Sequence, residues 1–128
     1  MDREKVMVLG IDPGSQHVGF SIGQGWAPPL GHGIEEPSHF LEKLKTTPAT
    51  RIVIERFDIR QLTLDSVATI KLIGVIEWIA GNRSIDVGWV NASEKVKFIR
   101  EVNQDLHITS HAGDAEAIRR YDLAYGKW

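Results

Sequence analysis

The 128-residue sequence contains no cysteine, which excludes a disulfide framework and a thiolate metal site. Long hydrophobic runs are also missing. The longest apolar stretch, residues 67–80, is interrupted by Lys71 and Glu77 and is too short to span a membrane. Residues 2–5 are all charged, and this start does not resemble a secretion signal. We therefore expect a cytoplasmic protein that has no membrane contact.

Positive charge is scarce for a DNA-binding protein. The chain has 15 lysine and arginine residues against 17 aspartate and glutamate residues, a formal net charge of -2. Nucleic-acid-binding domains are usually basic, so this balance counts mildly against such a partner. A cluster of catalytic acids would lower the total without removing a local basic face. No linker, repeat or low-complexity run divides the chain, and we predict a single domain over residues 1–128.

Two short apolar runs each end in a carboxylate. Residues 6–11 lead into Asp12, after which Pro13 and Gly14 force a turn, and residues 18–23 alternate bulky with small side chains. This pattern predicts a β-hairpin built on a buried central strand. Residues 51–57 predict a second short strand carrying Glu55 near its end. If the two strands are neighbours, both carboxylates lie at the same edge of the sheet.

The remaining patterns complete an α/β fold. Strands are predicted at residues 30–34 and 85–90, and helices at residues 38–45, 65–80, 91–102 and 110–125. This order predicts a five-stranded mixed sheet, with three antiparallel and two parallel strands and helices on both faces, as in RNase H-like domains. The helix at 65–80 is apolar around most of its circumference, so part of it is expected to form a dimer face that includes Ile73 and Ile76.

The last predicted helix begins with His111 and Asp114, which are spaced three residues apart and share one face. If its first turn packs over the sheet edge, these residues join Asp12 and Glu55. Carboxylates gathered at one point repel each other unless a cation is present, and hard oxygen ligands suit Mg²⁺ or Mn²⁺. Two such ions about 4 Å apart can activate water for phosphodiester cleavage. His111 would ligate a metal, or position or deprotonate the water.

Each of these residues also has a purely structural interpretation. Residues 12–14 form a common turn sequence, and Glu55 could pair with Arg56 or Arg51. His111 and Asp114 could be ordinary helix-start residues, a position that suits the aspartate better than a charged histidine. One shared site explains all four residues more simply than four separate structural roles.

Taken in order, these segments resemble the motifs of RuvC-type Holliday junction resolvases. The resemblance covers nearly the whole chain. The first motif lies at residues 10–14, and the second, a hydrophobic motif ending in glutamate, lies at residues 52–55. A dimerisation helix matches residues 71–76, a Ser/Ala-Glu-Lys segment matches residues 91–95, and a final His-x-x-Asp-Ala motif matches residues 111–115. The connection from Lys95 to His111 looks shorter than in that family. This compact, cysteine-free form suggests a bacteriophage or mobile-element protein acting in the host cytoplasm.

The resemblance implies a metal-dependent endonuclease that nicks branched DNA, Holliday junctions above all, in recombination and repair. It implies a homodimer that joins through the helix at 65–80. It also implies two Mg²⁺ ions, for which Mn²⁺ would substitute. The implied catalytic residues and metal ligands are Asp12, Glu55, His111 and Asp114.

The same resemblance implies DNA contacts by Lys95, at a phosphate, and by Phe57, stacked on an unpaired base. A solvated lysine and a core phenylalanine are the structural alternatives. Arg56 and Lys97 are further candidates for DNA contact. If the protein binds DNA, the basic residues should lie on one side, around the acidic cluster; they are Lys95, Lys97, Arg100, Arg119, Arg120, Arg56 and Arg60.

Three other functions remain open from the sequence. A nuclease of the same fold could act on forks, flaps or RNA–DNA hybrids. A non-catalytic dimer could bind DNA on the same fold. An actin-like ATP-binding domain could also begin with the pattern at residues 10–14, although the sequence shows neither a second lobe nor a glycine-rich adenosine-binding segment.

Overall fold

The computed structural model describes residues 2–57 and 62–128. Its centre is a sheet whose strands lie in the order β3-β2-β1-β4-β5. Neighbouring pairs β1–β2 and β2–β3 are antiparallel, while β1–β4 and β4–β5 are parallel. The strands are β1 (Met7–Asp12), β2 (Val18–Gln24), β3 (Gly31–Glu35), β4 (Arg51–Glu55) and β5 (Asp86–Val90). This mixed sheet confirms the fold class predicted from the sequence.

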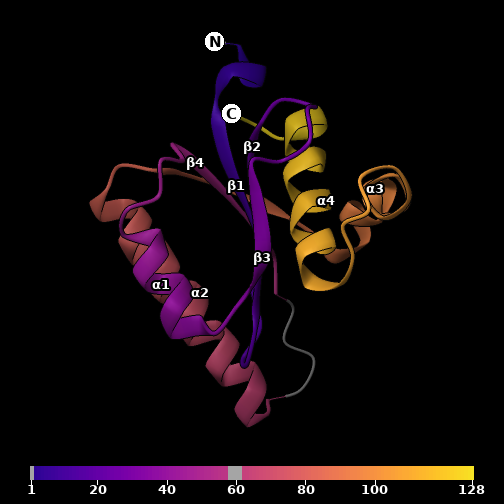
Figure 1. Ribbon diagram of the computed structural model, residues 1–128. Coiled ribbons are helices and arrows are strands. Elements are labelled where there is room, and N and C mark those ends of the chain that lie inside the picture. Colours follow the sequence, from indigo (N-terminus) through magenta and orange to yellow (C-terminus); the bar gives the residue numbers. More distant parts are fainter. Residues whose placement is uncertain (1, 58–61) are drawn as a thin grey trace.

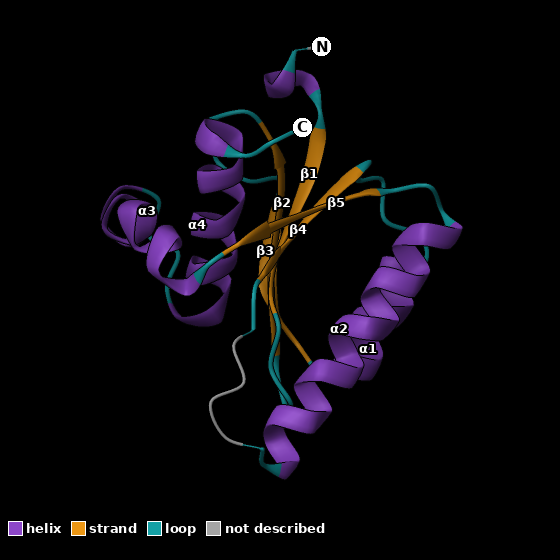
Figure 2. Cartoon of the chain, turned by 180° about the vertical axis from the view of Figure 1, so that it is seen from behind, coloured by secondary structure: helices purple, strands orange, loops and turns teal. Residues whose placement is uncertain are grey.

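Helices cover both faces of the sheet (Figures 1 and 2). On one face lie α1 and α2, and on the other lies α4, with α3 beside it. Their bounds, with the short 3-10 turn η1 (Arg3–Lys5), are α1 (Pro37–Leu44), α2 (Leu64–Asn82), α3 (Ala92–Asp105) and α4 (Ser110–Tyr125). Each predicted helix is present within a few residues of its expected bounds. None of the described helices has the length and hydrophobicity of a membrane span.

The main hydrophobic core fills the space between the sheet and the pair α1 and α2. Ile11, Ile52 and Ile54 project from β1 and β4 and are completely buried, as is Ile76 of α2. Burying each such side chain stabilises the fold by roughly 1.5–3 kcal/mol. Because side chains alternate along a strand, Asp12 and Glu55 are directed to the opposite face, which α4 covers.

Helix α4 packs directly against the backbone of β1 and β2. A Cβ atom added at Gly10 would collide with the carbonyl oxygen of Ala115, and one added at Gly19 would collide with the carbonyl of His111. Only glycine therefore permits this approach. The close packing brings the first turn of α4 over the end of β1, where Asp12 lies.

A buried ionic network anchors the same helix. Glu116 is fully buried; it accepts a hydrogen bond from Ser21 Oγ at 2.8 Å and pairs with Arg119 at 2.7 Å and Arg120 at 2.8 Å. Both guanidinium groups also donate to carbonyl oxygens of the loop after β2. The expectation that Arg119 and Arg120 face DNA is therefore wrong: their charges are neutralised inside the protein.

This network predicts a large difference between two glutamate substitutions. Replacing Glu116 with alanine leaves two buried guanidinium groups without their carboxylate and should cost about 3–5 kcal/mol of unfolding free energy. Replacing Glu101, which pairs only with Arg120 and is 43% exposed, should cost less than about 1 kcal/mol. Urea denaturation at neutral pH measures both, and equal losses would contradict the anchoring role of Glu116.

Candidate metal site

Two carboxylates meet at one edge of the sheet, as the sequence predicts. Strands β1 and β4 are parallel neighbours, with Ile11 paired to Ile54, and each strand ends at the next residue. Asp12 and Glu55 therefore lie side by side, on the face that α4 covers. The structural alternative that pairs Glu55 with Arg51 is wrong, because the Arg51 guanidinium binds Asp122 through two hydrogen bonds of 2.7 and 2.9 Å.

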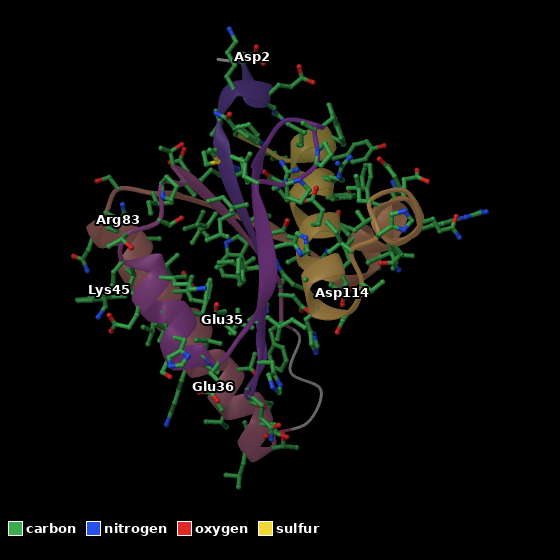
Figure 3. The ribbon with its side chains drawn as sticks, viewed as in Figure 1. Asp2, Glu35, Glu36, Lys45, Arg83 and Asp114 are labelled. Atoms are coloured by element: carbon green, nitrogen blue, oxygen red, sulfur yellow. The ribbon has the colours of Figure 1, made fainter. Side chains whose placement is uncertain are left out.

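Helix α4 adds two further potential ligands. His111 Nδ1 lies 2.8 Å from Asp12 Oδ2. One ligand atom from each of Asp12, His111 and Asp114 can be chosen so that all three lie within 4.8 Å of one another. Figure 3 shows Asp114 on the first turns of α4, beside the sheet. Two carboxylates and an imidazole form a donor set that fits a divalent cation such as Mg²⁺ or Mn²⁺.

Glu55 has a different neighbour. The ammonium group of Lys95 forms an ion pair with Glu55 Oε1 and lies 3.5 Å from Asp114 Oδ2. Glu55 Oε1 is buried, and no donor among the described residues reaches it with good hydrogen-bond geometry. The Lys95 side chain is only 14% exposed. The structure thus places Lys95 between two of the carboxylates, and the alternative of a solvated lysine is wrong.

Opposing effects set the charge state of this pair. Burial raises the pKa of Glu55, and the nearby charge of Asp12 raises it further, so the pKa stays above its ordinary value although Lys95 acts to lower it. For Lys95, burial acts to lower the pKa, but the contact with Glu55 and the charges of Asp12 and Asp114 outweigh burial and raise it. Lys95 is therefore a stable cation at neutral pH.

The first turn of α3 holds Lys95 in position. The Asn91 backbone N–H donates to Glu94 Oε1 at 2.9 Å, which confirms the capping pattern seen in the sequence. The hydroxyl of Tyr121 donates to the other oxygen of Glu94 at 2.6 Å and so ties α3 to α4. Lys95 is the next residue after Glu94, whose carboxylate is fixed by these two hydrogen bonds.

A polar recess of about 300 Å³ adjoins the cluster. Within it, Ser15 Oγ donates to Asp65 Oδ1 at 3.3 Å. The recess is lined by Gly14, Ser15, Gln16, His17, Asp65 and His111. Sequence reasoning missed this feature, because His17 looks like an ordinary turn residue and only the folded chain brings the start of α2 to the β1–β2 turn.

Four of the candidate DNA contacts are exposed, at the end of β4 and on α3. Arg56 and Phe57 follow β4, and Phe57 is 38% exposed, so it is not a core residue. Lys97 is exposed, and its ammonium lies 4.9 Å from the centre of the Tyr125 ring. Arg100 is exposed on α3. Arg60 lies outside the described residues.

Topology and the strand-end carboxylates define an RNase H-like domain. Within this class, the fold is similar to that of T. thermophilus RuvC in complex with a Holliday junction substrate, at 16% identity and a TM-score of 0.76 over 94% of this chain and 96% of that one. Another Thermus thermophilus RuvC structure is 18% identical, with a TM-score of 0.71 and coverages of 94% and 97%.

Fowlpox virus resolvase, in complex with substrate Holliday junction DNA, shares the fold at a TM-score of 0.60 and 11% identity, over 92% of this chain and 97% of that one. No protein-family model and no curated protein matches the sequence. The structural comparisons therefore establish a RuvC-like RNase H fold.

The contact between α3 and α4 predicts a measurable pKa change. The Tyr121 hydroxyl, followed by the Asn91 N–H, lowers the pKa of Glu94 below its ordinary value of 4.5. A lowered folded-state pKa gives stability that is present above pH 4.5 and is lost as the pH falls through the folded-state value. Tyr121→Phe should raise the pKa of Glu94 and shrink this pH dependence, as measured by NMR titration of the carboxyl carbon.

Tyr125→Phe provides the matched control, because Tyr125 packs against the Tyr121 ring at 5.0 Å and is not among the groups that lower the pKa of Glu94. Its Glu94 titration should follow that of the unmodified protein. An unchanged Glu94 pKa in Tyr121→Phe would show that the hydroxyl does not determine it.

Proposed function

We propose that the chain is a single-domain, divalent-metal-dependent endonuclease that cleaves phosphodiester bonds in branched DNA, chiefly Holliday junctions, during recombination and repair. The observation that carries this proposal is the meeting of Asp12, His111 and Asp114 at the sheet edge, with ligand atoms within 4.8 Å of one another. Their position in a RuvC-like fold supports it, since similar folds occur in two complexes with Holliday junction DNA.

The metal ligands in this proposal are Asp12, Glu55, His111 and Asp114. They would hold two Mg²⁺ ions, with Mn²⁺ as a substitute. Such ions supply a water-derived nucleophile at neutral pH and stabilise charge on the leaving oxygen. The buried Glu55 Oε1 already contacts a positive charge, the Lys95 ammonium, which supports its assignment as an oxygen that binds cations.

His111 is the group proposed to accept the proton of the attacking water. An ionised Asp12 carboxylate can only accept hydrogen bonds, so the 2.8 Å contact places the proton of the imidazole on Nδ1. Nε2 then carries the free lone pair, and this atom either ligates an ion or accepts a proton from water, but not both at once. Asp12 fixes both the tautomer and the ring orientation, as a carboxylate partner commonly does for a functional histidine.

DNA contacts in this proposal come from residues around the same edge. Lys95 reaches the carboxylates and would contact the phosphate to be cleaved. Arg56 and Lys97 are exposed and would bind flanking phosphates. Phe57 is sufficiently exposed to stack on an unpaired base at a branch point.

We also propose a homodimer formed through α2. The outer face of this helix exposes Ile70 at 37%, Val75 at 42% and Trp78 at 71%. Large exposed apolar side chains gathered on one helix favour an interaction surface. The expectation that Ile73 and Ile76 form the dimer face is wrong, because they are 8% and 0% exposed and belong to the core.

The dimer proposal predicts that Trp78→Lys yields a folded monomer, since the substitution replaces the most exposed of these three apolar side chains with a charge. Ile76→Lys should instead unfold the chain, because it buries a charge in the core. Leu30→Lys, a change at a 74% exposed residue before β3, should leave the dimer intact. Sedimentation analysis with circular dichroism separates these outcomes, and a monomeric unmodified protein would overturn the proposal.

Cleavage of a labelled four-way junction tests the proposed activity. Paired, metal-dependent nicks are expected in the junction and not in linear duplex. Asp12→Asn removes a negative ligand oxygen and should lower the rate at least about 100-fold, since metal sites contribute several kcal/mol to transition-state stabilisation. Asp86→Asn makes the same charge change at the far end of the sheet, where β5 begins, and should cleave normally.

Other results of this assay point to other functions. Metal-dependent cutting of forks, flaps or RNA–DNA hybrids would keep the site and change the substrate. A folded protein that binds Mg²⁺ and cuts nothing would contradict the enzyme proposal in favour of a DNA-binding dimer, and ATP binding would favour an actin-like domain.

A further inference from the structure

Lys95 occupies an unusual position for a lysine that would contact DNA phosphate. Its ammonium does not extend into solvent; it forms an ion pair with Glu55 and lies 3.5 Å from Asp114. These carboxylates have side chains only 18% and 34% exposed, so water screens them incompletely. The Lys95 ammonium therefore neutralises negative charge in this cluster, as a bound metal ion would.

The potential ligands fall into two groups around the Lys95 ammonium. Asp12, His111 and Asp114 approach one another closely enough to share one ion. Glu55 lies beside Asp12 on the neighbouring strand, but its carboxylate is paired with Lys95. The residues thus present one three-ligand group, in which Asp114 is 3.5 Å from the ammonium, and one carboxylate in direct contact with the ammonium.

We propose that the Lys95 ammonium occupies the second cation position in the DNA-free protein, so that one divalent ion binds without substrate and a second enters only when Lys95 leaves Glu55. This inference rests on the proposed function, because it takes the carboxylate cluster to be a divalent-metal site. It goes further by giving Lys95 control over how many ions the free protein holds.

Charge balance supports a single ion in the free protein. Asp12, Glu55 and Asp114 carry three negative charges when ionised, and one divalent ion together with the Lys95 ammonium neutralises them. A second divalent ion would place excess positive charge in a partly buried site, where such an excess is strongly unfavourable. Displacement of Lys95 removes one positive charge and frees Glu55 for the incoming ion.

The chemistry of lysine makes this exchange feasible. Its ammonium is a compact charge on a flexible four-carbon stem, and it donates hydrogen bonds to a carboxylate or to a phosphate with little geometric demand. A DNA phosphate brought to the sheet edge is therefore an alternative partner for Lys95. Substrate binding would move the ammonium from Glu55 to the phosphate and open the second position at the same time.

Counting bound Mn²⁺ in the absence of DNA tests the proposal. Electron paramagnetic resonance of free Mn²⁺ and calorimetric titration should give one ion per chain for the unmodified protein. Lys95→Met, which keeps the length of the side chain without its charge, should bind two. The second ion should bind at least about tenfold more tightly than to the unmodified protein, because the positive charge of Lys95, which repels the ion, has been removed from beside Glu55.

Two further variants make the count decisive. The side chain introduced by Lys95→Gln is neutral and can still donate a hydrogen bond to Glu55, so this variant should also bind two ions. It keeps the test valid if Lys95→Met fails to fold. Lys45→Met removes the same charge from the C-terminal end of α1, where Lys45 pairs with Glu42 on the other side of the sheet (Figure 3). That control should still bind one ion.

Two ions of similar affinity in the unmodified protein would overturn the proposal. So would a folded Lys95 variant that binds one ion, or binds more weakly, because Lys95 would then merely position Glu55. These counts are independent of the nuclease assay. A protein that binds one ion, gains a second on loss of Lys95 and cleaves no DNA would support this inference and contradict the proposed activity.

Discussion

The direct contact of α4 with the backbones of β1 and β2 is the constraint on which the rest of the structure depends. It requires glycine at positions 10 and 19, where any side chain would meet the backbone of the helix. Within that contact, the buried Glu116 fixes the rotation of the helix through its ion pairs. Rotation of α4 by even one residue would carry His111 and Asp114 away from Asp12. The packing of α4 therefore determines the geometry of the site.

The chain has a formal net charge of -2, and several of its positive charges lie inside the protein. Arg51, Arg119 and Arg120 are buried in ion pairs with carboxylates of α4, so their charges serve the interior. Lys95 is likewise engaged at the acidic cluster. The surface available to a polyanion depends on a few exposed residues around α3 and the end of β4. Long-range electrostatic attraction of a polyanion to this surface is therefore weak.

The sequence predicts the strands well, and it predicts that Asp12, His111 and Asp114 lie close together, because both follow from local patterns. Apolar runs that end at Asp12 and Glu55, and the helical spacing of His111 and Asp114, contain the needed information. The burial of Arg119 and Arg120 is not local, because it depends on Glu116 together with carbonyl groups from the distant β2–β3 loop. Helix α2 is apolar on all sides, so its sequence does not reveal that Ile76 faces the core while Trp78 faces outward.

Geometry also separates the nuclease proposal from an ATP-binding hairpin of similar sequence. A hairpin that cradles phosphate needs an open turn and free backbone N–H groups. Here α4 packs directly on β1 and β2, Asp12 is only 6% exposed, and its carboxylate contacts His111. Gathering Asp12, Glu55 and Asp114 at one edge costs electrostatic repulsion that a purely structural role would not require. Such a local cost is typical of a functional site, and a cation is the partner that relieves it.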